Sequence, residues 1–129
     1  MTTKNGVIYL PKHDASLIIR IYKCNFTLNE AIGGYAGALS FIDLVSDNID
    51  IWGNHFGGNM ATYVNLKGGH GGAIMITTQN SSLSEEFVCR ISSNSFIYNH
   101  ADRFGGAVYS INKPPDMVDN EWLYNTASD

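Results

Sequence analysis

Short apolar stretches recur along the chain and are separated by turns rich in glycine and asparagine. One set occupies 7–10, 38–44, 73–77 and 107–111, and a second occupies 17–22, 49–52 and 87–91, with a weaker stretch at 117–118. Short, partly alternating apolar runs bounded by turn residues are typical of β-strands. The longest helical candidate, 30–38, is interrupted by Gly33, Gly34 and Gly37, which disfavour a helix. The pattern therefore predicts an all-β protein with almost no helix.

Two sequence motifs alternate along the chain in a fixed order. The first has the form aromatic-x-x-Asn-x-Ala, usually with an Asn two positions before the aromatic residue, and occurs at 26–31, 56–61, 96–101 and 122–127. The second is Ala36-Gly37-Ala38-Leu39, Gly71-Gly72-Ala73-Ile74 and Gly105-Gly106-Ala107-Val108, with a degenerate copy at 5–8. Equivalent positions Val7, Ala38, Ala73 and Ala107 are 31, 35 and 34 residues apart. A regular period of this size indicates a solenoid of stacked repeats.

The repeat predicts a single domain, 1–129, built as a parallel β-solenoid of about four coils. Its coils are expected at roughly 7–37, 38–72, 73–106 and 107–129. The sequence has no recognisable polar cap at either end, although solenoids need caps for solubility. We therefore expect an uncapped fragment of a longer solenoid. Open coil ends expose unpaired strand edges, which favour end-to-end self-association.

Equivalent positions of stacked coils should lie one above another, about 4.8 Å apart. An internal aromatic stack is expected from Phe26, Phe56, Phe96 and Trp122. Small side chains are expected where the wall leaves little room, at Ala31, Ala61, Ala101 and Ala127. An asparagine ladder is expected at a turn, because Asn tolerates left-handed geometry and its amide can bond the next amide; its members are Asn29, Asn59, Asn99 and Asn125. Tight glycine corners are expected at Gly37, Gly71, Gly72, Gly105 and Gly106, because glycine permits positive φ or close backbone approach.

These paired motifs resemble the repeats of the chlamydial polymorphic outer membrane proteins, a family of adhesin-like autotransporters. The resemblance rests on Phe-x-x-Asn followed by Gly-Gly-Ala-Ile or Gly-Gly-Ala-Val, as at Phe56 to Asn59 with 71–74 and Phe96 to Asn99 with 105–108. It covers nearly the whole chain, although the last copy has Trp122 in place of Phe and no glycine motif after it. The resemblance implies a right-handed parallel β-helix that is extracellular or displayed at the cell surface.

Composition and charge exclude several other classes. The chain has 129 residues and a net charge of −4, with 8 Lys and Arg against 12 Asp and Glu. A mildly acidic chain without a basic cluster is a poor nucleic-acid binder, and no apolar run approaches a membrane span. No signal-peptide core is present at the N-terminus. Two cysteines, Cys24 and Cys89, cannot form a disulfide framework; their predicted coils are about 10 Å apart, so we expect free, buried thiols.

The sequence shows no catalytic constellation, cofactor motif or metal site. The acids Asp43, Asp47, Asp50, Glu85, Glu86, Asp102, Asp116 and Asp119 do not fall into one register, although sugar hydrolysis needs clustered carboxylates. We expect Asp43, Asp47 and Asp50 to lie solvated on one strand–loop–strand segment. The four histidines, His13, His55, His70 and His100, occupy different repeat positions, so the sequence gives no metal-binding pattern.

The leading functional hypothesis is a non-enzymatic surface or secreted adhesin-like module that attaches to a host-cell or glycan surface. The paired motifs and the lack of a catalytic cluster favour it. One alternative is a carbohydrate-active β-helix enzyme of the polysaccharide lyase or hydrolase kind. The other is a rigid structural stalk without a binding face.

Overall fold

The computed structural model describes residues 2–3, 7–12, 16–45, 47–79 and 87–129, and within them the protein is all-β without a helix. The sequence also predicts that the insertion 79–86 forms a loop on one side of the solenoid; except for Gln79, it lies outside the described residues. The chain runs four times through the same set of four strands, and each such run is one pass. In each pass, two of the four strands match the apolar stretches of the sequence. The other two are short strands around the aromatic motif that the sequence pattern did not predict.

These strands form four sheets, A to D. Sheet B contains β2 (Ile8–Leu10), β6 (Leu39–Leu44), β11 (Ile74–Thr78) and β15 (Val108–Ile111). Sheet C contains β3 (Ile18–Tyr22), β7 (Asn48–Trp52), β12 (Val88–Ser92) and β16 (Asp116–Val118). Sheet D contains β4 (Asn25–Thr27), β8 (His55–Gly57), β13 (Ser95–Ile97) and β17 (Glu121–Leu123). Sheet A contains β1 (Thr2–Thr3), β5 (Glu30–Ile32), β9 (Met60–Val64), β14 (His100–Ala101), β18 (Thr126–Ala127) and β10 (Lys67–Gly68).

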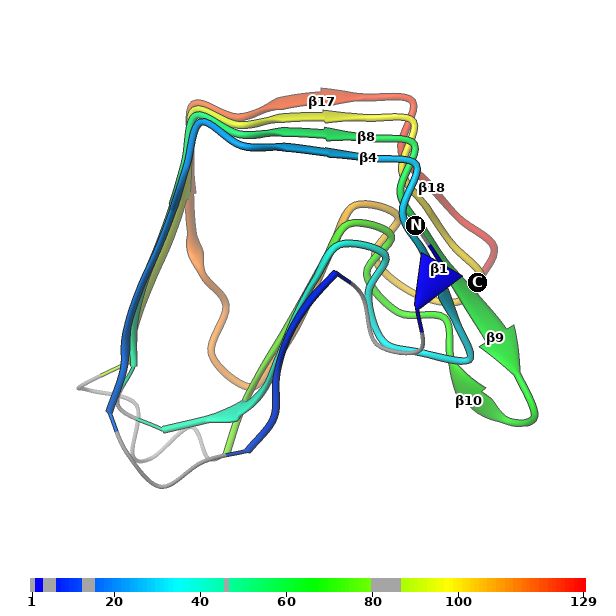
Figure 1. The fold of residues 1–129 in the computed structure, drawn as a ribbon, viewed down its shortest axis with the longest axis horizontal. Helices are drawn as coiled ribbons and strands as arrows, with labels where there is room; N and C mark the ends of the chain where they lie inside the picture. The colour runs from blue at the N-terminus through cyan, green and yellow to red at the C-terminus, as the bar shows by residue number, and fades with distance from the viewer. Residues whose placement is uncertain (1, 4–6, 13–15, 46, 80–86) are drawn as a thin grey trace.

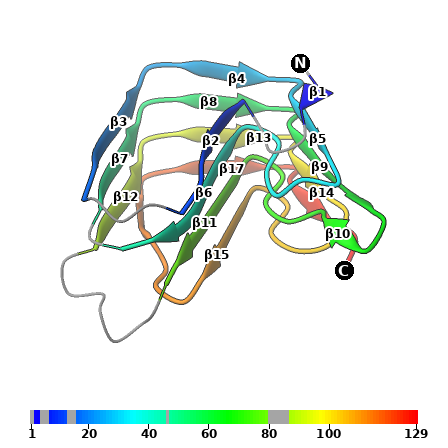
Figure 2. The same cartoon turned by 60° about the horizontal axis from the view of Figure 1, so that its bottom comes forward.

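The chain visits the sheets in the order B, C, D, A and follows this path four times in total. Each strand pairs in parallel with its equivalents in the neighbouring passes, as the stacked edges of β4, β8 and β17 show (Figure 1). The strands of all four sheets lie side by side in the tilted view (Figure 2). Consecutive passes therefore bring equivalent sequence positions into contact.

One antiparallel strand departs from this plan. Strand β10 folds back on β9 as a hairpin, and Asn65 and Leu66 at its tip both have positive φ. Two positive φ values at the centre of a two-residue turn match the twist of a β-hairpin. This hairpin projects from the body of the molecule (Figure 1). It accounts for extra residues between the aromatic motif and the glycine corner of the second pass.

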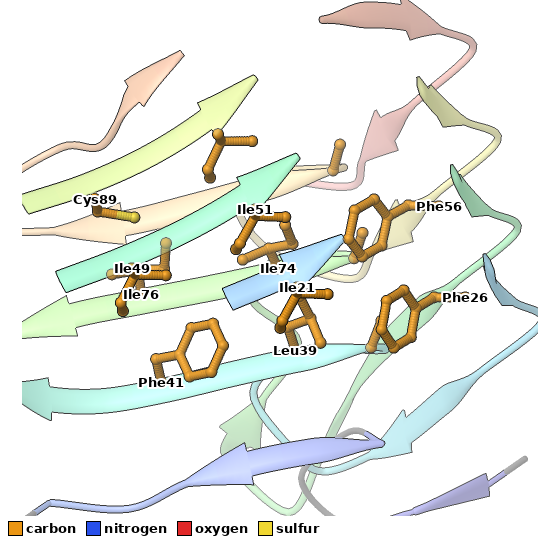
Figure 3. Packing of buried hydrophobic residues seen from close by; sticks show 14 of the residues in the cluster. Ile21, Phe26, Leu39, Phe41, Ile49, Ile51, Phe56, Ile74, Ile76 and Cys89 are labelled. Carbon is orange, nitrogen blue, oxygen red and sulfur yellow. The ribbon is translucent and has the colours of Figure 1, made fainter. Parts of the chain in front are cut away.

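The hydrophobic core lies between sheets B, C and D. Burial alternates along β7, where Ile49 and Ile51 point inward while Asp50 and Trp52 face outward. The inward residues of sheet C meet Leu39, Ile74 and Phe56 from the other two sheets (Figure 3). This period-2 alternation is what a sheet with one face on the core requires, and it leaves one polar column on the outside of sheet C.

Candidate functional site

The aromatic residues of the first motif form one stacked column inside the molecule. Ring centroids are 5.1 Å apart for Phe26 and Phe56, 4.9 Å for Phe56 and Phe96, and 4.5 Å for Phe96 and Trp122. The rings are nearly parallel because strict strand register places each one directly over the next. Trp122 stacks on one side and stays 45% exposed. The column is thus a structural element, and its last ring is not internal.

The predicted asparagines form a ladder of buried amides next to this column. The Asn59 Nδ2 group donates to the Phe26 carbonyl and to Asn99 Oδ1, at 2.8 and 2.9 Å. Its Oδ1 accepts from both the backbone N–H and the Nδ2 group of Asn29. Asn125 continues the same pattern at the end of the ladder. The side chains of Asn59, Asn99 and Asn125 therefore satisfy backbone groups at a corner where the strand ladder is interrupted.

The predicted bonding of each ladder amide to the next is confirmed, but the predicted left-handed geometry of these asparagines was wrong. The left-handed conformation belongs to the residue before each ladder asparagine, at Leu28, Gly58, Tyr98 and Tyr124. The asparagines themselves do not have positive φ in the structure. Asparagine is required at this corner for its side-chain amide, whose hydrogen bonds join neighbouring passes inside the molecule.

A second asparagine ladder lies at the corner between sheets C and D, where the sequence analysis did not place one. Asn54 Nδ2 donates to Asn94 Oδ1 at 3.0 Å, and Asn94 Nδ2 donates to Asn120 Oδ1 at 3.1 Å. Cys24 occupies the first position, and its backbone N–H donates to Asn54 Oδ1. The Asn two positions before three of the four aromatic residues was the signal that could have predicted this ladder.

The alanine and glycine positions lie where the backbones of neighbouring passes come close. Ala31, Ala61 and Ala101 are fully buried, whereas Ala127 in the last pass is exposed. A Cβ on Gly72 would lie 2.0 Å from the Gly106 carbonyl oxygen, and one on Gly37 would lie 2.4 Å from that of Gly72. Gly71 and Gly105 are similarly crowded and also have positive φ, at +66° and +68°. A Cβ on Gly106 would collide with the backbone of Thr126. Close approach and backbone conformation thus account for these corners.

The outer face of sheet C carries a column of charges of alternating sign. The strand register places Arg20 beside Asp50, Asp50 beside Arg90, and Arg90 beside Asp116. Opposite charges at adjacent cross-strand positions favour the register. No ion pair within 4 Å joins the two arginines to these aspartates in the described part of the chain. The arginines are exposed, and they project from a rigid sheet.

Two aromatic side chains lie beside this charge column. Tyr22 and Trp52 are register partners with ring centroids 6.3 Å apart in an edge-to-face arrangement, and they are 43% and 40% exposed. The Tyr22 hydroxyl donates to Asp50 Oδ2 at 2.8 Å, and this bond, with desolvation and the Asp50 charge, raises the pKa of Tyr22. Lys23 Nζ lies 5.4 Å from the Trp52 ring centroid, within cation–π range.

A shallow groove of about 500 Å³ runs over this face of sheet C. Arg20, Tyr22, Asp50 and Arg90 line it, together with Asn48 and Val88. A second groove of about 500 Å³ begins at Arg90 and continues past Asp116. An aromatic ring, a carboxylate and guanidinium groups in one groove can hold a polar ligand by stacking and hydrogen bonding. We name this surface, defined by Arg20, Tyr22, Asp50, Trp52 and Arg90, the sheet C face.

Asp43, Asp47, Asp102 and Asp119 do not line the groove beside Asp50. The expectation that Asp43, Asp47 and Asp50 are all solvated was wrong for Asp47. Asp47 is fully buried, and its carboxylate accepts the backbone N–H groups of Leu17 and Val45. Asp43 contacts the Thr77 hydroxyl instead. The carboxylate of Asp102 accepts the Tyr63 N–H and lies 3.2 Å from His100. Asp119 lines the corner groove described below, and Glu85 and Glu86 lie outside the described residues.

Within the described part of the chain, no group of three or more His, Cys, Asp or Glu side chains has the arrangement of a metal site. His55 contacts the Ser95 hydroxyl, and His100 contacts Thr126 and Asp102. The His70 ring stacks on Phe104 and on Tyr109, and burial together with the nearby Arg103 charge lowers its pKa. His13 lies outside the described residues.

The two thiols are free, but the expectation that both are buried was wrong. Cys89 lies in the core near Ile49, and burial raises its pKa to about 12 (Figure 3). Cys24 is exposed, and it takes the place of the ladder asparagine in the first pass, at the corner between sheets C and D. It lines a groove of about 540 Å³ with Lys23, His55 and Asp119.

We expect one of the two thiols to react with an aromatic disulfide reagent in the native protein. The thiolate is the reactive species, so the exposed Cys24 should react quickly and Cys89 should react only when the protein unfolds. The measurement is the time course of thiol release with and without urea. The C24S variant should lose the fast phase, and a fast phase that survives in C24S would contradict this placement of the thiols.

Comparison with known proteins gives no relative for this chain: no family model, no curated protein and no solved structure matches it. The part of the chain that the structure describes also contains no helix that is long and apolar enough to cross a membrane.

Proposed function

We propose that the chain is part of a right-handed parallel β-helix that acts, without catalysis, as an adhesin-like module attaching to a cell or glycan surface. Four passes through the same sheets, stacked in parallel and in register, support the β-helix. The handedness and the extracellular or cell-surface location follow from the resemblance to polymorphic outer membrane protein repeats.

The observation that carries the proposed attachment function is the sheet C face. Most polar side chains at the corners satisfy neighbouring backbone groups, whereas the outward residues of sheet C include exposed arginines and two half-exposed aromatic rings. Aromatic and arginine side chains are the residues that most often dominate binding surfaces. A sheet held by in-register strands on both sides presents them with little loss of conformational freedom on binding.

A carbohydrate-active enzyme is the second candidate, and one observation favours it. Asp50 and Asp116 flank Arg90 on the same outer column, so two carboxylates lie along connected grooves. Glycoside hydrolysis uses two carboxylates on opposite sides of the scissile bond. We place this candidate second because these carboxylates lie in a row on one flat face and do not oppose each other across a cleft.

The test of the attachment function is binding of the 129-residue protein to an array of immobilised glycans and to animal cells. We expect binding that Trp52→Ala weakens about tenfold or more, since a central exposed aromatic is a typical hot spot. Tyr124→Ala is the matched control, because Tyr124 is an exposed aromatic at another corner, and it should leave binding unchanged. Circular dichroism would verify that both variants are folded.

Two outcomes would contradict the attachment function. Binding to neither glycans nor cells would leave the structural stalk as the better interpretation. Release of reducing ends or unsaturated sugars from a bound polysaccharide, abolished by Asp50→Asn, would instead establish the enzyme.

A further inference from the structure

We propose that the sheet C face binds a linear acidic polysaccharide that runs along the stacking direction of the strands, with acid groups on alternate sugar units. This inference rests on the proposed attachment function and specifies its ligand. Three features of the face carry it: two available guanidinium groups, a carboxylate between them, and a pair of aromatic rings beside the column.

The two guanidinium groups favour an anionic ligand. Arg20 and Arg90 are both exposed, and in the described part of the chain neither guanidinium group makes a side-chain hydrogen bond or ion pair. A guanidinium binds a carboxylate or sulfate through two parallel hydrogen bonds. Because Asp50 separates the two arginines in the register, they are two strand spacings apart, or about 10 Å. Two acid groups at that separation along one ligand would contact both arginines.

The Asp50 carboxylate, which lies between the two arginines, determines which kind of sugar unit the ligand can place opposite it. Asp50 Oδ2 already accepts a hydrogen bond from the Tyr22 hydroxyl. It can accept further hydrogen bonds from sugar hydroxyls, but it repels an acid group placed opposite it. The face therefore favours a polymer in which a neutral unit separates successive acid groups. A nucleic acid, which is charged at every unit, or an anionic lipid surface would place a negative charge opposite Asp50.

The aromatic pair favours a sugar over an acidic peptide as the ligand. Tyr22 exposes ring surface in the groove, and Trp52, which is also partly exposed, packs edge-to-face against Tyr22. A pyranose ring presents flat patches of C–H groups that pack on aromatic faces, while its hydroxyls remain free to bond polar neighbours. Lys23 beside Trp52 adds a third cation at this edge.

Because the protein as a whole is negatively charged, binding of an acidic ligand must depend on the few cations at the sheet C face. The net charge is −4, yet three of the eight Lys and Arg residues, Arg20, Lys23 and Arg90, lie on or beside sheet C. General electrostatic attraction for polyanions is therefore weak. Binding should depend on these few side chains, and moderate salt should weaken it without abolishing it, because the aromatic contacts are insensitive to screening.

The experiment compares three polysaccharides as probes in a direct binding assay with the 129-residue protein. Hyaluronan has an acid on every second sugar, polygalacturonate has one on every sugar, and dextran has none. We expect the tightest binding to hyaluronan. Arg20→Gln and Arg90→Gln should each weaken it about tenfold, the loss expected for a charge-assisted hydrogen-bonded contact. Lys67→Gln, which removes an exposed cation from the β10 hairpin, is the control and should have no effect.

Asp50→Asn provides a test in the opposite direction. The amide removes the negative charge and keeps an acceptor for the Tyr22 hydroxyl. Binding of polygalacturonate should therefore increase several-fold in this variant, while binding of hyaluronan should change little. An unchanged preference in Asp50→Asn would overturn the role assigned to the central carboxylate.

The outcomes separate this inference from the function on which it rests. Binding that Trp52→Ala abolishes but that the arginine variants leave unchanged, or equally tight binding to dextran, would overturn the acidic ligand and leave attachment intact. Equal affinity for polygalacturonate, or for polyglutamate as an acidic peptide, would overturn the alternating polysaccharide. Binding to no glycan and no cell would overturn the attachment function itself.

Discussion

Replacing Phe56 with alanine should lower the free energy of unfolding by about 3–5 kcal/mol, the range observed when a buried aromatic is truncated in a rigid core. Phe56 is fully buried, and its ring stacks on Phe26 on one side and on Phe96 on the other. The neighbouring rings are fixed by strand pairing and cannot close the gap. The alanine variant would therefore lose both the burial of the ring and its contacts with two others. Urea unfolding followed by circular dichroism measures the loss.

Trp122→Ala is the matched control for this prediction. Trp122 belongs to the same column, but it stacks on one ring and is nearly half exposed. Its removal exposes less new apolar surface and creates no enclosed cavity, so the loss should be well under that of Phe56→Ala. Losses of the same size at both positions would contradict a column whose middle members are buried by the neighbouring passes.

The sequence predicted the parts of the fold in which a residue type repeats at equivalent positions. The apolar strands of sheets B and C, and the recurrence of Phe, Asn and Ala, are visible because each pass must bury the same positions. The strands of sheets D and A were not predicted, since a strand of two or three residues such as β13 or β14 is too short to show an alternating pattern. The left-handed residues Leu28 and Tyr98 were missed for another reason: bulky residues rarely adopt positive φ.

The charge column of the sheet C face could not be predicted from spacing alone. Arg20 and Asp50 are 30 residues apart, Asp50 and Arg90 are 40 apart, and Arg90 and Asp116 are 26 apart. The spacings differ because the β9–β10 hairpin and the segment after β11 add residues to one pass and not to others. Only the strand register places these four side chains in one column. Surface residues are also under no packing constraint, so their types do not repeat.

Replacing Asn59 with alanine should lower the free energy of unfolding by roughly 2–4 kcal/mol, because buried polar groups would lose their partners. The variant would leave the Phe26 carbonyl and Asn99 Oδ1 without the Nδ2 donor. It would also leave the backbone N–H of Asn29 without its acceptor. Asn25→Ala, which removes an exposed amide from the outer face of sheet D, is the control and should change stability by less than about 0.5 kcal/mol.

The N59D variant separates the hydrogen bonds of this amide from its volume. A carboxylate has nearly the same size, but it accepts at both oxygens and would face the Phe26 carbonyl and Asn99 Oδ1, which are themselves acceptors. Burial and these acceptors should raise the pKa of the new carboxyl group above its value in the unfolded chain. Stability should therefore recover as the pH falls, since the folded state then binds a proton more tightly than the unfolded state. Unfolding measured at neutral and acidic pH tests this, and a loss in N59D that did not depend on pH would show that the amide contributes by filling space and not by bridging the passes.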